Sequence, residues 1–132
     1  MAAVPIEGIH DRFIGAWRLA SLEEQGADGQ LHRPDCSGML VFTRDGHVSV
    51  QVMYRDPNAG PGQYAQGGYE ASFARYELDE RAHTFTFHVE RALVRTLIGK
   101  HLPRAFEPSG NQLVVTPTNP DEHWRVTWEH YQ

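Results

Sequence analysis

The feature that most constrains this chain is a strict alternation of apolar and polar residues within short segments. Between residues 47 and 54, every even-numbered residue is valine or tyrosine, whereas the odd-numbered residues are mainly polar. Between residues 84 and 90, the odd-numbered residues are phenylalanine or valine, and the even-numbered ones are polar. A period of two is that of a half-buried β-strand and excludes an amphipathic helix. The sequence therefore predicts an all-β protein.

Turn-forming clusters separate the alternating segments, at residues 27–29, 45–46, 79–82, 108–111 and 119–121. Such spacing is typical of an antiparallel meander of about eight to ten short strands. A meander of this length folds either as a sandwich or as a closed barrel, and a barrel of about eight strands can hold one small ligand. The only plausible helix is a turn or two around residues 6–14, where isoleucine and phenylalanine could form one apolar stripe.

Length and composition narrow the class of protein. A chain of 132 residues is the size of one domain, so we expect a single domain over residues 1–132. Its one cysteine, Cys36, excludes an internal disulfide. The formal charge of −5, with no run of Lys or Arg, disfavours nucleic acid and membrane partners. The N-terminus has neither the basic nor the apolar region of a secretory signal, which predicts a cytoplasmic protein.

A family resemblance enters at Gly15-Ala16-Trp17, which resembles the Gly-x-Trp in the first strand of lipocalins and fatty-acid-binding proteins. Residues 38–53, 76–79, 88–90 and 99–106 resemble the bacterial lipocalin-like domain proteins in order and spacing. The resemblance implies a single antiparallel up-and-down lipocalin-like β-barrel of about 8–10 strands with a short N-terminal helical plug. One end would be closed by the N-terminal segment and Trp17, and a pocket would lie at the other end.

The resemblance also implies a contact between Trp17 and an arginine of the last strand, for which Arg125 is the matching candidate. The chain departs from two related groups. We expect the chain to have none of the signal peptide, disulfides and C-terminal helix that are usual in secreted lipocalins. It also lacks the helical pair and the Arg-x-Tyr of intracellular fatty-acid-binding proteins, since Arg125-Val126-Thr127 has no tyrosine. These departures weaken the prediction of a fatty-acid carrier.

The leading functional hypothesis is a barrel that binds a small, largely apolar molecule, aromatic or polyketide-like, as a monomer or homodimer and without a cofactor. The physical basis is a closed apolar lining with few polar anchors. The candidate ligand-binding residues include Gln51 as a polar anchor and Tyr69 as a contact from the loop. The floor and walls would be formed by Trp17, Phe42, Met53, Tyr76, Phe106 and Trp128.

The second hypothesis is a cofactor-independent enzyme, an isomerase, cyclase or dehydratase. His88 and Glu90 occupy one face of a strand at i, i+2, the spacing of an acid–base pair, although simple alternation sends His88 to solvent. Arg104 shares parity with the apolar Leu102 and Phe106, so a buried guanidinium there would need a carboxylate or an anionic ligand group as partner. A protein that sequesters its ligand in stress or resistance would have the same sequence features.

Residues 56–68 form a Gly- and Pro-rich loop that is either a surface connection or a mobile lid carrying Tyr64 and Tyr69. It is not a phosphate-binding loop, because Pro61 removes a backbone donor and no Lys-Ser/Thr follows. The eight histidines have no metal-ligand spacing, so no metal is predicted. A site assembled from separate strands, such as His47 with His88 or His130, stays open.

Overall fold

The computed structural model describes residues 9–131 and contains nine strands and little helix. A single-turn helix α1 (Ile9–Phe13) precedes the first strand, and a 3-10 turn η2 (Arg95–Leu97) lies between the sixth and seventh. Part of the predicted plug around residues 6–14 falls outside the described residues. The strands are β1 (Gly15–Gln25), β2 (Leu31–His32), β3 (Cys36–Phe42), β4 (His47–Tyr54), β5 (Tyr69–Asp79), β6 (Thr84–Ala92), β7 (His101–Ser109), β8 (Gln112–Pro117) and β9 (Trp124–His130).

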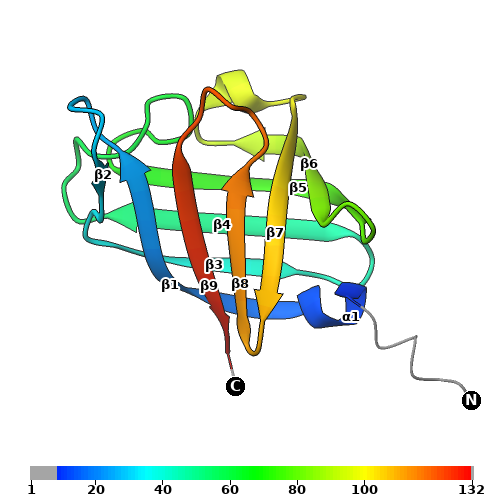
Figure 1. Cartoon of the computed structure of the whole chain (residues 1–132). Helices are drawn as coiled ribbons and strands as arrows, with labels where there is room; N and C mark the ends of the chain where they lie inside the picture. Colours follow the sequence, from blue (N-terminus) through cyan, green and yellow to red (C-terminus); the bar gives the residue numbers. More distant parts are fainter. Residues whose placement is uncertain (1–8, 132) are drawn as a thin grey trace, which may run out of the picture.

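The strands close into an eight-stranded antiparallel barrel, which confirms the predicted fold class. Neighbours along the sheet follow the order β1-β3-β4-β5-β6-β7-β8-β9, and β9 pairs back onto β1. The two-residue strand β2 is added beside the end of β1, at Glu24 and Gln25. Figure 1 shows β7, β8 and β9 lying across β3, β4 and β5 at a steep angle, with α1 at one end of the barrel. Closure removes the exposed strand edges of a meander.

Aromatic side chains fill the end of the barrel that α1 covers. The ring of Phe13 packs edge-to-face on those of Phe42, Phe85 and Phe106, with centroids 4.8–5.6 Å apart. All four side chains are almost completely buried. The indole N–H of Trp17 donates to the carbonyl oxygen of Phe13 at 2.9 Å, which ties the helix to the first strand. The expectation that the N-terminal segment and Trp17 close this end agrees with the structure.

The residue that packs on Trp17 is His130, not Arg125. The ring centroids of His130 and Trp17 lie 4.4 Å apart, and His130 Nε2 hydrogen-bonds the carbonyl oxygen of Ile14 at 3.0 Å. Arg125 is exposed because alternation along β9 turns Val126, Trp128 and His130 inward and Arg125 outward. Gly15 has φ +117°, and a Cβ there would lie 2.8 Å from the His130 ring, so both the backbone and the packing favour glycine.

Two irregularities change which residues face inward. The β1–β9 register shifts between Leu19 and Ser21, and the β5–β6 register shifts at Glu90. Beyond the first shift, Leu22 and Glu24 lie opposite Val126 and Trp124. A β-bulge re-aims the side chains that follow it, so a single parity does not hold along the whole of β1.

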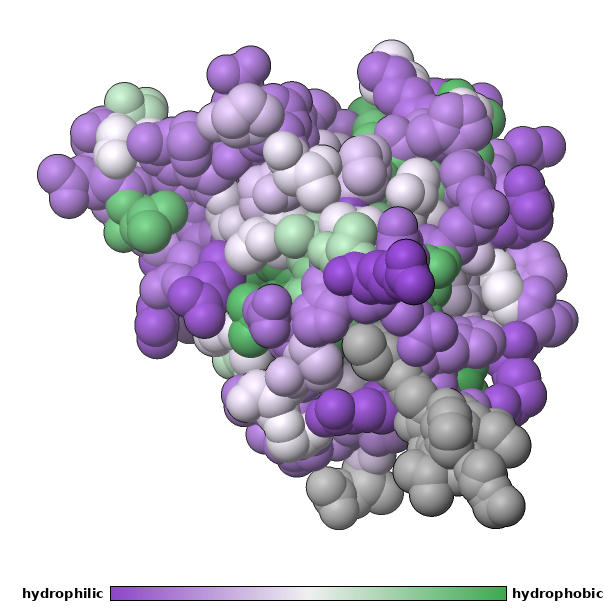
Figure 2. Space-filling model, turned by 45° about the vertical axis from the view of Figure 1, so that its right-hand side comes forward, coloured by the Kyte–Doolittle hydropathy of each residue, from purple (hydrophilic) through white to green (hydrophobic). Residues whose placement is uncertain are grey.

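On the face drawn in Figure 2, hydrophobic residues form only small areas between hydrophilic ones.

Candidate functional site

A cavity of about 80 Å³ lies inside the barrel at the end opposite α1. Residues of β1, β4 and β9, of the start of β5 and of the loop after β4 form its lining. The lining residues are Leu19, Leu22, Glu24, Val52, Tyr54, Pro61, Tyr64, Glu70, Trp124, Val126 and Trp128. Most of these side chains are apolar or aromatic, and only two are carboxylic acids. This composition is that of a small-molecule site with a few polar anchors.

The loop of residues 55–68 covers this cavity. Its Pro61 and Tyr64 line the cavity on one side and an outer cleft of about 370 Å³ on the other, and the two spaces also share Glu24 and Trp124. Gly60, with φ +94°, packs against Tyr54, since a Cβ there would lie 2.9 Å from the tyrosine ring. Displacing Pro61 and Tyr64 would therefore join the cavity to the cleft. This arrangement supports the lid interpretation of the loop.

Glu122, just before β9, holds the loop in place. Its Oε1 accepts hydrogen bonds from the Tyr64 hydroxyl at 2.7 Å, from Gln63 Nε2 at 3.3 Å and from the Trp124 indole at 3.2 Å. Hydrogen bonds to a charged acceptor contribute about 1.5–3 kcal/mol each. We call Glu122 and these three donors the latch. No feature of the sequence marks Glu122 as a partner of a loop 58 residues away.

Two carboxyl groups face the cavity from different strands. Glu24 on β1 accepts a hydrogen bond from the Tyr54 hydroxyl at 3.3 Å. Burial raises the pKa of Glu24, and this hydrogen bond opposes the rise. Burial also raises the pKa of Glu70, on β5, to about 7; the nearby Arg104 lowers it and Glu24 raises it. Among residues 9–131, the Glu70 carboxyl has no hydrogen-bond or ion-pair partner within normal distance.

The raised pKa of Glu70 has a consequence for stability. A carboxyl whose pKa is higher in the folded chain than in the unfolded one opposes folding when ionised. The cost is absent below about pH 4.5 and complete above about pH 7. We expect Glu70→Gln to melt several degrees above the unsubstituted protein at about pH 8 and at nearly the same temperature at about pH 4.5. Thermal unfolding followed by circular dichroism at both pH values measures this, and equal differences at the two values would contradict it.

Arg104 on β7 is the one buried charged residue among those described, at 7% exposure. Its guanidinium lies over the rings of Trp124 and Tyr64, 4.9 and 5.4 Å from their centroids. One N–H donates to the carbonyl oxygen of Pro103 at 3.2 Å. The parity argument for an inward Arg104 agrees with this position. Its partners are aromatic faces, with Glu70 near, and Arg104 itself does not line the cavity.

The structure does not bring His88, Glu90 and Arg104 together. His88 hydrogen-bonds the exposed Glu77 through Nε2 and His101 through Nδ1, on the outer wall of β5, β6 and β7. Glu90 sits at the register shift of β6 and lines none of the cavities described here. The acid–base pair needed an inward His88, whereas β6 turns Phe85 and Val89 inward. These three side chains therefore do not face one cavity in the structure.

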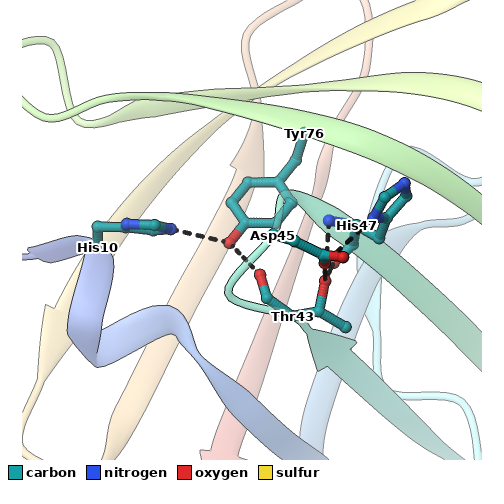
Figure 3. Close-up of polar contacts among 5 residues, drawn as sticks. All are labelled: His10, Thr43, Asp45, His47 and Tyr76. Carbon is teal, nitrogen blue, oxygen red and sulfur yellow. Dashed lines mark hydrogen bonds and ion pairs between the residues drawn. The ribbon is translucent and has the colours of Figure 1, made fainter.

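Of the eight predicted ligand-binding residues, only Trp128 lines the cavity. Trp17, Phe42, Tyr76 and Phe106 point inward but belong to the buried core toward the closed end. There the Tyr76 hydroxyl donates to the carbonyl oxygen of Thr43 at 2.8 Å and meets His10 Nε2 at 3.1 Å, as Figure 3 shows.

The other three predicted ligand-binding residues, Gln51, Met53 and Tyr69, lie on the outer wall. All three are exposed, and Met53 has 49% of its surface accessible to solvent. Their parity is the reason, because Val52 and Tyr54 on β4 and Glu70 on β5 take the inward positions.

The described histidines do not gather in one metal site, although His88 and His101 contact each other. His47 contacts Asp45, His88 contacts Glu77, and His130 packs against Trp17. In residues 9–131 no three His, Cys, Asp or Glu side chains are grouped so as to hold a metal ion. Burial raises the pKa of the Cys36 thiol to about 11, so it stays protonated near neutral pH and is a poor nucleophile.

A closed antiparallel barrel with one plugged end and a lined cavity at the other defines a calycin-like architecture. The sequence profile of the lipocalin-like domain family matches residues 14–130, and the chain belongs to that family. None of the curated proteins matches it. Within the described part of the chain, no helix has the length and apolarity needed to cross a membrane.

Solved structures support the same fold. A lipocalin-like protein from Bacteroides uniformis aligns with 91% of this chain and 99% of its own, at 17% identity and a TM-score of 0.53. An uncharacterized protein from Bacteroides eggerthii aligns with 90% of this chain and 99% of its own, at 12% identity and a TM-score of 0.54. At these identities the likeness concerns the fold alone.

Proposed function

We propose that this protein binds a small, largely apolar molecule in the cavity between Trp128 and the loop of residues 55–68. The observation that carries the proposal is the contrast between the two ends of the barrel. One end is filled by packed aromatic rings, whereas the other holds a largely apolar cavity that is partly covered by a latched loop. Over the Leu, Val and Trp part of the lining, an apolar ligand replaces water without loss of hydrogen bonds to the protein.

The size of the cavity limits the ligand. An apolar cavity of roughly 150 Å³ accommodates benzene, and the cavity here is about 80 Å³ with the loop in place. A ligand with an aromatic ring therefore fits once Tyr64 and Pro61 move toward the outer cleft. Single-ring aromatic molecules suit the lining better than long acyl chains, because the packed rings around Phe42 block the rest of the barrel.

Tryptophan fluorescence tests this proposal. Two of the three tryptophans, Trp124 and Trp128, line the cavity. Benzyl alcohol and toluene should therefore change the emission in a saturable manner. Filling the cavity by Val52→Phe should weaken binding about tenfold or more, while Met53→Phe, on the outer wall of the same strand, should leave it unchanged.

The filled variant must fold for this comparison to hold. Circular dichroism checks its fold, and Val126→Phe fills the same cavity from β9 if Val52→Phe fails to fold. Emission that rises linearly with every compound, or equal affinities in the inward and outward variants, would contradict the proposal.

A further inference from the structure

The charges at the cavity do not balance. Glu24 and Glu70 line it, and Arg104 is the one cation close to them among the described residues. Arg104 lies behind Trp124 and Tyr64, with its guanidinium over both rings. A molecule inside the cavity therefore meets carboxyl oxygens and aromatic faces before it meets the guanidinium.

We propose that the natural ligand of this cavity carries a basic nitrogen, protonated when bound, that pairs with Glu70 while its apolar part lies among Trp124, Trp128 and Val52. This inference rests on the proposed function, since it assigns the chemistry of the molecule that the cavity takes. One positive charge compensates the carboxyl that Arg104 leaves unbalanced. Aromatic rings around the nitrogen add cation–π attraction, which is stronger in a site shielded from water.

Glu70 is a better partner for this nitrogen than Glu24. The Glu24 carboxyl already accepts the Tyr54 hydroxyl, whereas Glu70 makes no hydrogen bond with residues 9–131. A half-buried carboxylate without a protein donor is costly, and a ligand N–H reduces that cost. Glu70 also lies at the start of β5 and lines the same cavity as Tyr64 of the loop, so it is accessible to a ligand that enters beside Tyr64.

An anionic ligand fits this site poorly. It would lie against two carboxyl groups, and it would have to displace Trp124 or Tyr64 from Arg104 to reach the guanidinium. The guanidinium has already given one N–H to Pro103. Arg104 is therefore a positioning residue that holds the two rings and moderates the charge of Glu70.

The pairing makes binding depend on pH. The titratable and charged groups around Glu70 are Glu24 on β1, Tyr54 on β4, Tyr64 in the loop and Arg104 on β7. With a pKa of about 7 in the empty cavity, Glu70 is protonated below that pH, and the cost of removing the proton so that it can pair with an ammonium group grows as the pH falls. The affinity for a cation should then decrease by up to about tenfold per pH unit below this value. The affinity for a neutral molecule should not decrease as the pH falls.

The experiment compares benzylamine, benzyl alcohol and benzoate, which share one ring and differ in charge. Binding is followed by tryptophan fluorescence at about pH 8 and about pH 5. We expect benzylamine to bind about tenfold or more tightly than benzyl alcohol at the higher pH, with most of this preference lost at the lower pH. Glu70→Gln should abolish the preference at both pH values. Glu77→Gln, an exposed glutamate on the same strand, should retain it.

The outcomes separate this inference from the proposed function. Equal affinities for benzylamine and benzyl alcohol, or a preference that survives in Glu70→Gln, would overturn the inference and leave the apolar site intact. Tightest binding of benzoate would overturn it in favour of an anion site at Arg104. Failure of all three compounds to bind saturably would overturn the proposed function as well.

Discussion

Replacing Phe42 with alanine should lower the free energy of unfolding by about 3–5 kcal/mol and leave the ligand affinity of the folded protein unchanged. Phe42 is 1% exposed, and its ring packs on those of Phe13, Tyr76 and Phe85 with centroids 4.9, 4.9 and 5.8 Å apart. Removing the ring leaves a void among side chains that the barrel holds in place. The loss is a large part of the total stability of a domain of this size.

Urea denaturation measures this change, and Phe73→Ala is the matched control. Phe73 lies on the outer face of β5 with 51% of its surface exposed, so its removal should cost about 0.5 kcal/mol or less. Benzyl alcohol binding is then compared among the folded proteins. A weaker affinity in Phe42→Ala would place Phe42 in the binding site, as the sequence suggested, whereas an unchanged affinity would assign it to the core alone.

The barrel could be predicted from the sequence because its strands alternate clearly. In residues 47–54 and 84–90 the inward face is valine, tyrosine or phenylalanine throughout, and the structure buries these positions in whole or in part. The Gly15-Trp17 motif located the plugged end for a physical reason. A left-handed glycine and an indole bound to Phe13 are both needed where the chain turns from α1 into β1.

Glu24 could not be predicted as a cavity residue, because a β-bulge in β1 changes which positions face inward. Counting by twos from Trp17 and Leu19 along β1 places Glu23 inside and Glu24 outside. The register shift between Leu19 and Ser21 reverses this order, so Glu24 lies at the cavity. No Gly or Pro marks the position of the shift. Such an irregularity depends on pairing with β9 rather than on local sequence.

Glu70 and Trp124, in contrast, could have been found from parity. Glu70 precedes the inward Tyr76 by six residues, and Trp124 precedes the inward Trp128 by four, so each pair shares a face. The prediction of Tyr69 and Met53 as ligand-binding residues did not follow the alternation of their own strands, in which Glu70 and Val52 face inward. The latch lies beyond sequence reasoning, because Tyr64 and Glu122 meet only when β9 closes the barrel.

If the loop of residues 55–68 gates the cavity, removal of the latch should accelerate ligand exchange. Glu122→Ala deletes one acceptor shared by Tyr64, Gln63 and Trp124. We expect a total loss of about 1.5–3 kcal/mol, the contribution of one charge-assisted bond, because the Gln63 bond is long and Trp124 lies on β9 rather than in the loop. The fraction of open loop, and with it the association rate constant, should rise about tenfold to a hundredfold. The dissociation rate constant should rise by a similar factor, because the same latch closes over the occupied cavity.

Stopped-flow fluorescence with benzyl alcohol measures both rate constants, and Asp121→Ala is the matched control. Asp121 is an exposed carboxylate beside Glu122 on the same cleft, so its removal changes the charge there equally and spares the latch. Tyr64→Phe keeps the ring on Arg104 and removes only the hydroxyl, and it should give a smaller increase. Rates in Glu122→Ala that match those in Asp121→Ala would show that the ligand enters by a route other than this loop.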